Sequence, residues 1–343
     1  MGRARLLRKA GACVPAHASP MDALTLPLVG LNALSTGLLL FLLASGLTLT
    51  YSLMGVLNFA HGSFYLLGAY LAWSLTQALG LGWALLLAPV LVGALGVLVE
   101  RWLLRRLRPA GHLPELLVTF GLGWILMESV PLFWGRQPLD LAVPEVLRGP
   151  WFTWAPAAQE AGVSGLPWQW SWGDGGGLCA GTASSALAGC VQFSRLRALG
   201  MAVSLGVLLV LAWVLWRTRL GLVVRAARSR PQVVAALGHD VPFAQGLVFG
   251  AGAALAALAG VVAAALRVVE PGMGQSIGAL VFAVVVIGGL GSLAGALAAS
   301  LLVGLLDAAA VAGGWALAGA LPYLLLVAVL LWRPRGLLGK RDG

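Results

Sequence analysis

The chain has 343 residues, 60% of them hydrophobic and only 10% charged, and its net charge is +10. Soluble domains carry about 25% charged residues, so this composition excludes a soluble globule and indicates an integral membrane protein. The apolar runs are about 20 residues long, which suits helices that cross a bilayer, and the short alternating segments of a membrane β-barrel do not occur. We therefore expect an all-α, polytopic bundle of transmembrane helices.

The first 20 residues form a basic segment without the long apolar centre of a signal peptide. Met21 then opens an apolar stretch that continues into the first span. We expect residues 1–20 to be a disordered basic extension, or to result from a start site assigned upstream of Met21. The transmembrane domain is expected over residues 21–343.

Apolar segments separated by polar or glycine-containing links predict the membrane spans. In chain order they cover about residues 24–50, 64–79, 83–104, 116–134, 199–216, 243–266, 277–290, 293–306 and 317–332. We expect eight or nine crossings, because the last two glycine-divided segments before the final span can form one crossing or two.

One apolar stretch, residues 46–73, is interrupted in its middle by Asn58, His61 and Ser63. Polar side chains in lipid are costly unless they face a bundle interior or a water-filled path. Glycines flank this group, so the backbone can break there. Two interpretations stay open: the polar side chains hydrogen-bond between helices, or they line a solute path.

A long polar loop at about residues 135–197 contains Trp151, Trp154, Trp168, Trp170 and Trp172. Clustered tryptophan beside a membrane is typical of an interfacial belt, and exposed aromatic residues also mark surfaces that bind partners. Cys179 and Cys190 lie in the same loop. They are either two free thiols or a disulfide, if the loop faces an oxidising compartment.

Arginines concentrate in three places: after the span at 83–104, in the loop at 217–242, and in the C-terminal tail. The positive-inside rule places these segments, including the C-terminus, in the cytoplasm, and the loop at 135–197 outside. Because the arginines lie between hydrophobic spans, we expect the basic charge to contact the membrane surface and not nucleic acid.

No pattern predicts an enzyme active site. The four histidines and three cysteines lack metal-ligand spacing, and no phosphate-binding loop occurs, so we predict no catalytic residue, no metal site and no cofactor. Glu100 is expected to pair with Arg101 or Arg105, and Asp307 to cap a helix near the outer surface. Glu128 is the best candidate for a functional carboxylate, with a buried hydrogen bond as the alternative.

Four motifs carry a resemblance to a known family. They are GVLNFAHGS at 55–63 followed by LGAY at 67–70, the segment 225–238, VIGGLGS at 286–292, and RPRGLLG at 333–339. In this order they resemble the permeases of branched-chain amino-acid ABC importers, over about residues 21–339. The resemblance implies the fold of ABC importer permeases and a multi-pass subunit of the inner (plasma) membrane. That subunit would form the translocation pathway for branched-chain or related small amino acids.

The resemblance and the polar positions together give the candidate pathway residues. These are Asn58, His61, Ser63, Glu128, Gly288, Gly289, Gly291 and Ser292. For the glycines, close helix packing and a helix break that lines the pathway both remain possible.

The basic loop predicts a short helix that begins at Pro231 and ends at Gly238. The resemblance implies that this helix docks into an ATPase, and the matching residues are Arg225, Ala226, Ala227, Pro231, Ala235, Ala236 and Gly238. A basic loop on the lipid surface is the alternative. Two departures from the family are Gln232, where an acidic residue is usual, and the absence of a lysine near Leu280.

The resemblance also implies partners: a second homologous permease, two cytoplasmic ATP-binding subunits and an extracytoplasmic solute-binding protein. ATP hydrolysis is expected on a separate subunit, since this chain has no nucleotide-binding motif. The alternatives are a related importer for urea or short amides, an ATP-independent secondary transporter or channel, and a structural or assembly membrane protein.

Overall fold

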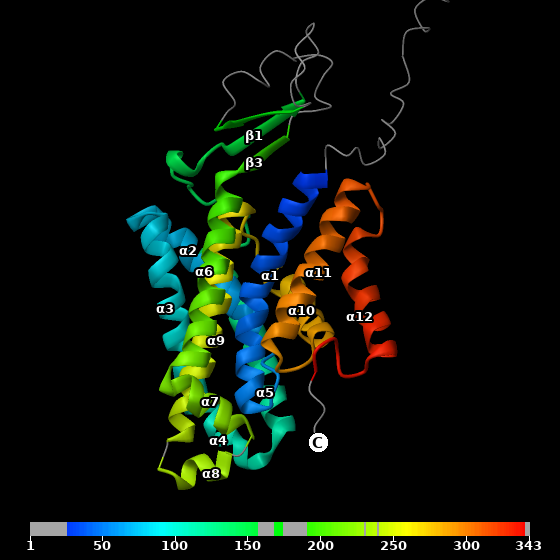
Figure 1. The fold of residues 1–343 in the computed structure, drawn as a ribbon. Helices are drawn as coiled ribbons and strands as arrows, with labels where there is room; N and C mark the ends of the chain where they lie inside the picture. The colour runs from blue at the N-terminus through cyan, green and yellow to red at the C-terminus, as the bar shows by residue number, and fades with distance from the viewer. Residues whose placement is uncertain (1–25, 157–167, 174–190, 230, 239, 340–343) are drawn as a thin grey trace, which may run out of the picture.

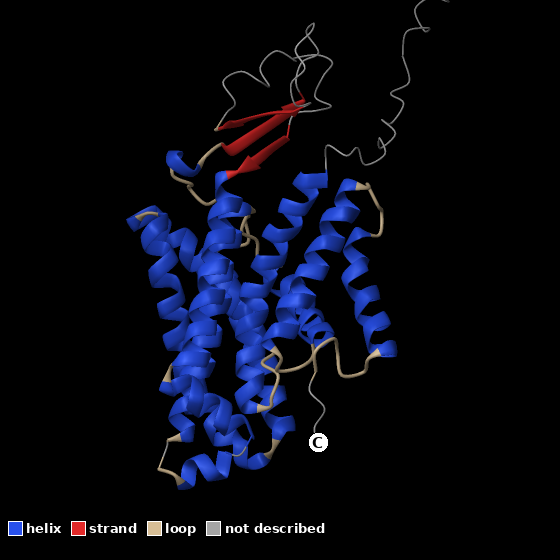
Figure 2. Cartoon of the chain, viewed as in Figure 1, coloured by secondary structure: helices blue, strands red, loops and turns tan. Residues whose placement is uncertain are grey.

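The computed structural model describes residues 26–156, 168–173, 191–229, 231–238 and 240–339. Within these ranges the chain forms a helical bundle with a small β-sheet at one end (Figure 1, Figure 2). The expected extension at residues 1–20 and the cysteines Cys179 and Cys190 lie outside the described ranges.

The bundle is built from long apolar helices. They are α1 (Leu26–Met54), α2 (His61–Leu79), α3 (Leu81–Val99), α5 (His112–Trp134), α6 (Arg195–Arg217), α9 (Val241–Leu266), α10 (Met273–Gly288), α11 (Leu293–Ala312) and α12 (Leu321–Trp332). The shorter helical pieces are the π-helical turn η1 (Glu100–Leu104), α4 (Arg105–Leu107), the 3-10 turns η2 (Arg108–Ala110), η3 (Glu145–Leu147) and η5 (Ala318–Ala320), α7 (Arg219–Ser229) and α8 (Pro231–Ala236).

Six helical segments are long and apolar enough to cross a membrane, counted over the described residues. They are α1, α3 with its continuation to Ala110, α5, α6, α9 and α11. The segments Met273–Gly288 and Ala318–Trp332 are apolar but shorter. The prediction of a polytopic helical membrane protein is therefore confirmed.

Helix α9 lies at the centre of the bundle and packs against α1, α2 and α3. Its small residues let the neighbouring backbones approach closely. A Cβ atom added to Gly260 would lie 2.1 Å from the Tyr65 carbonyl oxygen on α2, and one added to Gly252 would lie 2.9 Å from the Gly46 carbonyl oxygen on α1. Glycine at these two positions of α9 therefore serves close helix packing.

The predicted interruption of the apolar stretch at residues 46–73 is also confirmed. Helix α1 ends at Met54 and α2 begins at His61, whose ring nitrogen Nε2 lies 2.9 Å from the Leu43 carbonyl oxygen. Since Leu43 lies well before the end of α1, residues 55–60 return into the bundle, and α2 starts inside it. Helix α10 starts beside it, because a Cβ atom on Gly62 would lie 2.4 Å from the Gly274 carbonyl oxygen.

The expectation of an all-α chain is wrong for the loop after α5. Here β1 (Pro150–Pro156), β2 (Trp168–Trp172) and β3 (Val191–Ser194) form an antiparallel sheet in the order β2-β1-β3. Strand β2 reads Trp-Gln-Trp-Ser-Trp, an alternation that suits a strand with two different faces. Aromatic side chains on neighbouring strands also stabilise such a sheet, and the rings of Trp151 and Trp172 lie 5.8 Å apart.

The two ends of the bundle differ. The sheet and the start of α1 lie at one end, while α4, α8 and the C-terminal segment lie at the other (Figure 1). The three arginine-rich segments therefore lie toward the same end of the bundle. Figure 2 shows that this end is helical, with short connecting loops.

Candidate functional site

A cavity of about 500 Å³ lies where α2 and α10 begin. Most of its wall is apolar and aromatic, from side chains such as Leu43, Phe120 and Phe282. The polar minority consists of Asn58, His61, Gln275 and Tyr323. A mainly apolar space with a few polar groups is the usual form of a site for a small molecule. We call this space the main cavity.

His61 lines the main cavity and is buried. Its Nε2 atom lies 2.9 Å from the Leu43 carbonyl oxygen, which can only accept, so Nε2 carries the ring proton. The other ring nitrogen, Nδ1, is a buried acceptor without a partner among the described residues. His61 thus makes the interhelical bond foreseen by one interpretation, and its side chain also lines the main cavity, as the other requires.

Asn58 also lines the main cavity and is 5% exposed. Its side-chain Oδ1 accepts from the Ala60 backbone N–H at 3.1 Å, and its carbonyl oxygen accepts from the His61 N–H at 3.2 Å. These bonds shape the turn that leads into α2. No acceptor for the amide Nδ2 of Asn58 is found within the described part of the chain.

Ser63 has a different position from the two polar residues that precede it. Its hydroxyl donates to the Gly123 carbonyl oxygen at 2.9 Å, and the side chain is 1% exposed. This bond ties α2 to α5 two residues after His61. Gly123 itself lines the main cavity, so Ser63 supports the wall without being one of its lining residues.

Glu128 lies on α5 at a neighbouring space of about 290 Å³, which Arg136 and Gln275 also line. We call it the outer space. This outer space shares Trp124, Met127 and Gln275 with the main cavity. It lies at the end of α5 from which the chain continues to the sheet, because Pro131 and Arg136 line it. The two spaces together form a series that leads from the sheet end toward the starts of α2 and α10.

Gly288, Gly289, Gly291 and Ser292 form the turn between α10 and α11. Gly289 and Gly291 have φ angles of 99° and 75°, which favour glycine, and the Ser292 hydroxyl caps α11 by accepting from the Gly295 N–H at 3.1 Å. This turn lines none of the cavities described in this structure.

The C-terminal segment packs onto this turn. The Leu337 N–H donates to the Ile287 carbonyl oxygen at 2.8 Å, and the Leu338 N–H donates to that of Gly288 at 3.1 Å. Gly336 has a φ of 80°, and a Cβ there would lie 2.5 Å from the Gly289 nitrogen. Two of the motifs noted in the sequence, at 286–292 and 333–339, therefore form one unit at the α8 end of the molecule.

The short helix predicted at Pro231 is present as α8 (Pro231–Ala236), and Gly238 follows it with a φ of 85°. The additional helix α7 precedes it. The buried side chains Val224, Ala227 and Val234 pack α7 and α8 against α1 and α9. On the outer surface lie Arg225, Ala226, Ala235, Ala236 and Gly238, with Leu237 73% exposed.

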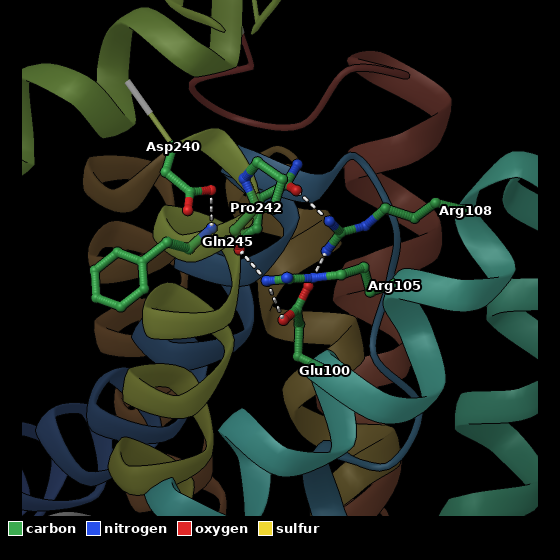
Figure 3. A network of polar contacts seen from close by, with 7 residues as sticks. Glu100, Arg105, Arg108, Asp240, Pro242 and Gln245 are labelled. Carbon is green, nitrogen blue, oxygen red and sulfur yellow. Dashed lines mark hydrogen bonds and ion pairs between the residues drawn. The ribbon is translucent and has the colours of Figure 1, made fainter. Parts of the chain in front are cut away.

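A network of charges fixes the start of α9 to the end of α3, next to this loop (Figure 3). Glu100 has no exposed side-chain surface and pairs with Arg108 at 2.6 Å and Arg105 at 3.6 Å. Arg105 donates to the Pro242 carbonyl oxygen at 3.0 Å, and Arg108 donates to Gln245. The expected pair with Arg105 is confirmed.

The prediction missed the closer partner of Glu100. Arg108 follows it by two helical turns, and that spacing is the signal that the sequence offered. The Asp240 carboxylate also accepts from the Phe243 N–H at 2.9 Å and caps α9. Asp307, by contrast, was expected to cap a helix but lies inside α11.

Comparison with known proteins agrees with this architecture. The family model described as "Branched-chain amino acid transport system / permease component" matches residues 30–330. The chain is 30% identical over 323 residues to the high-affinity branched-chain amino acid transport system permease protein BraD of Pseudomonas aeruginosa, covering 91% of this chain and 95% of that protein.

Two further relatives carry similar names. The permease protein LivH of Escherichia coli K12 is 28% identical, with 91% of this chain and 94% of that protein covered. A probable LivH of Methanocaldococcus jannaschii is 27% identical, with 88% and 89% covered. No solved structure matches the chain. The family match over most of the chain, with the helical bundle and the four motifs, shows that this protein belongs to the branched-chain amino-acid transport system permease family.

Proposed function

We propose that this chain is the permease subunit of an ATP-driven importer and forms the pathway for branched-chain amino acids across the inner membrane. The observation that carries the proposal is the meeting of two helix starts, those of α2 and α10, at the wall of the main cavity. Helices that begin inside the membrane are a common way to build a transporter binding site. The names of BraD and LivH support the substrate class.

The groups at the main cavity suit a small apolar amino acid. The first turns of α2 and α10 present the positive ends of two helix dipoles, which favour a carboxylate. The Asn58 amide can donate to that carboxylate. The apolar wall suits an aliphatic side chain.

The proposed topology has nine crossings, formed by α1, α2, α3, α5, α6, α9, α10, α11 and α12. With an odd number, the start of α1 is extracytoplasmic and the C-terminus is cytoplasmic. The concentration of arginines at the α8 end supports this orientation. The loop at 135–197 with its sheet then faces the solute-binding protein, and the outer space at Glu128 is the entrance to the pathway.

The same orientation puts α7 and α8 in the cytoplasm, where we propose that α8 docks into an ATP-binding subunit. Exposed small residues and Leu237 give α8 an uncharged outer face, and its inner face packs against α1 and α9. A movement of the ATPase is thereby passed to helices that pack around the pathway. The complete importer comprises two permeases, two ATP-binding subunits and the solute-binding protein.

The experiment is transport by the complex in proteoliposomes with its solute-binding protein. Leucine, isoleucine, valine and urea are offered with and without internal ATP. We expect ATP-dependent uptake of the three amino acids. Uptake of urea alone would indicate a related importer, and uptake without ATP or ATP-binding subunits would indicate a secondary transporter or channel.

A further inference from the structure

A second cavity, of about 230 Å³, lies on the other side of α10 from the main cavity. Ile277 and Leu280 of α10 line this second cavity, whereas Gly278 and Phe282 of the same helix line the main one. Helix α10 therefore forms a partition between two spaces. The second cavity also lies toward the sheet end, because the end of α9 and the starts of α6 and α12 contribute to it.

Three charged side chains from three helices or their ends line the second cavity: Arg197 of α6, Arg267 after α9 and Asp307 of α11. Arg197 donates to the neutral amide of Asn32. Neither Arg267 nor Asp307 takes part in an ion pair with any other described residue. Arg197 and Arg267 are exposed and Asp307 is half-buried, so charges of both signs line one space without an ion pair between them. A ligand that carries both charges can pair with them there.

The remaining wall separates into a polar and an aliphatic part. Ser35, Thr36 and Tyr65 add hydroxyl groups, and Ser35 and Tyr65 are buried. The aliphatic part consists of Leu39, Leu40, Leu43, Leu266, Ile277, Leu280 and Val303. A ligand that matches this wall must carry a negative group, a positive group and an apolar side chain.

We propose that the second cavity binds one apolar α-amino acid as its zwitterion. The arginines bind the carboxylate, Asp307 binds the ammonium group, and the leucine, isoleucine and valine side chains contact the aliphatic side chain. The volume equals roughly eight waters at about 30 Å³ each, which is the scale of a single amino acid and not of a peptide. The substrate class rests on the proposed function, but the site is distinct from the main cavity.

Simpler ligands suit the second cavity less well. An anion would leave Asp307 facing a like charge, and an amine would face two arginines without a carboxylate. A zwitterionic lipid headgroup shares both charges, but its acyl chains lie outside, so it leaves the aliphatic wall uncovered. The amino acid uses both the charges and that wall.

The test is photolabelling of the assembled transporter in lipid nanodiscs, without the solute-binding protein, using a diazirine analogue of leucine. Adducts are mapped by peptide mass spectrometry. We expect adducts on wall residues of the second cavity, such as Leu39, Leu266 or Val303. Leucine should compete at concentrations at least about tenfold lower than 3-methylbutylamine or 4-methylpentanoate, which each lack one charged group.

Variants separate this site from the main cavity. Asp307→Asn and Arg267→Gln should each reduce labelling of the second cavity at least about tenfold. Arg267→Lys should retain part of it, and His61→Ala should leave it intact. Because His61→Ala acts on the proposed pathway, loss of uptake with retained labelling would show that the two sites are independent.

The proposal is overturned if no adducts map to the second cavity, or if the two singly charged analogues compete as well as leucine. If phosphatidylethanolamine displaced the label as well as leucine does at the same concentration, the cavity would be assigned to a lipid headgroup. The competition series uses the unmodified chain, so it decides the matter even if a variant does not fold. A failure of ATP-driven uptake with labelling as expected would contradict the proposed function and leave this site standing.

Discussion

Glu100 is a carboxylate without exposed surface in a chain where charged residues are rare. Burial of such a group is costly unless ion pairs and hydrogen bonds compensate it. Arg108 supplies an ion pair with a hydrogen bond and Arg105 a longer ion pair, and the same two arginines reach the start of α9. One residue therefore organises the contact between the α3 extension and the helix that follows α8.

We expect Glu100→Gln to destabilise the transporter, because the neutral amide gives up a charge-assisted hydrogen bond from Arg108 worth about 1.5–3 kcal/mol. The arginines are partly exposed and can turn to water, so the loss stays in this range. Thermal unfolding in detergent measures the effect. Arg101→Gln is the control, since Arg101 is exposed on the same turn and outside this network. Equal melting temperatures for the two variants would contradict the assigned role of Glu100.

The candidate residues could be predicted only in part. Asn58 and His61 stand out because polar side chains in an apolar run require a reason. Whether they face a cavity depends on the depth at which α2 starts, which is set by contacts with α1 and α10. Ser63 lies two residues further and bonds to Gly123. Gln275 gives no signal in the sequence, because only the fold brings it to both spaces.

At the scale of elements, close backbone contact determines where α9 lies. Gly260 contacts the Tyr65 carbonyl oxygen so closely that any side chain must displace α2, whereas Gly206 on α6 has nothing within 4 Å of an added Cβ. Alanine favours a helix by about 1 kcal/mol over glycine at an open position. We therefore expect substitution by alanine to destabilise the protein at Gly260 but not at Gly206.

We predict that Gly260→Ala lowers the yield of folded protein and its melting temperature, because α2 and α9 must separate. Gly206→Ala should leave both unchanged or raise them slightly. Size-exclusion profiles and thermal unfolding of the purified proteins measure the difference. Similar behaviour of the two variants would show that the contact between Gly260 and Tyr65 does not limit the packing of α9.

The short helix α8 carries the second prediction at this scale. Leu237→Asp adds a charge to its uncharged outer surface and should weaken binding of the ATP-binding subunit by at least about tenfold, since desolvating a charge in an interface is costly. Val146→Asp is the matched control, because Val146 is similarly exposed but lies in η3, just before β1 of the sheet. Co-purification of the subunits measures binding. Loss of binding in the control alone would reverse the proposed orientation.

Elements differed in how far the sequence revealed them. The apolar helices, the break before His61 and the helix at Pro231 follow from local signals such as hydrophobic length, glycine and proline. The sheet was missed because its strands are short and separated by long segments, so its pairing depends on distant residues. The contact of the glycine turn at 288–292 with the C-terminal segment is likewise tertiary and has no local signal.

At the scale of the whole molecule, the two ends carry different kinds of residues and elements. Arginine-rich elements, α8 and the C-terminal segment lie toward one end, and the tryptophan-bearing sheet lies at the opposite end (Figure 1). The outer space and the main cavity follow each other from the sheet end inward. The helices around the main cavity connect to α8 through α1 and α9. This arrangement suits a subunit that receives solute at one end and mechanical force at the other.

The central claim is that the main cavity is the translocation pathway, and cysteine modification tests it most directly. In a cysteine-free background, Ala279→Cys introduces a thiol at the main cavity, and Leu305→Cys introduces one on the exposed surface of α11. Both are treated with a small methanethiosulfonate reagent before leucine uptake is measured in proteoliposomes. Modification of Ala279→Cys should abolish uptake, external leucine should slow that modification, and Leu305→Cys should transport normally. Full uptake by modified Ala279→Cys would contradict the claim.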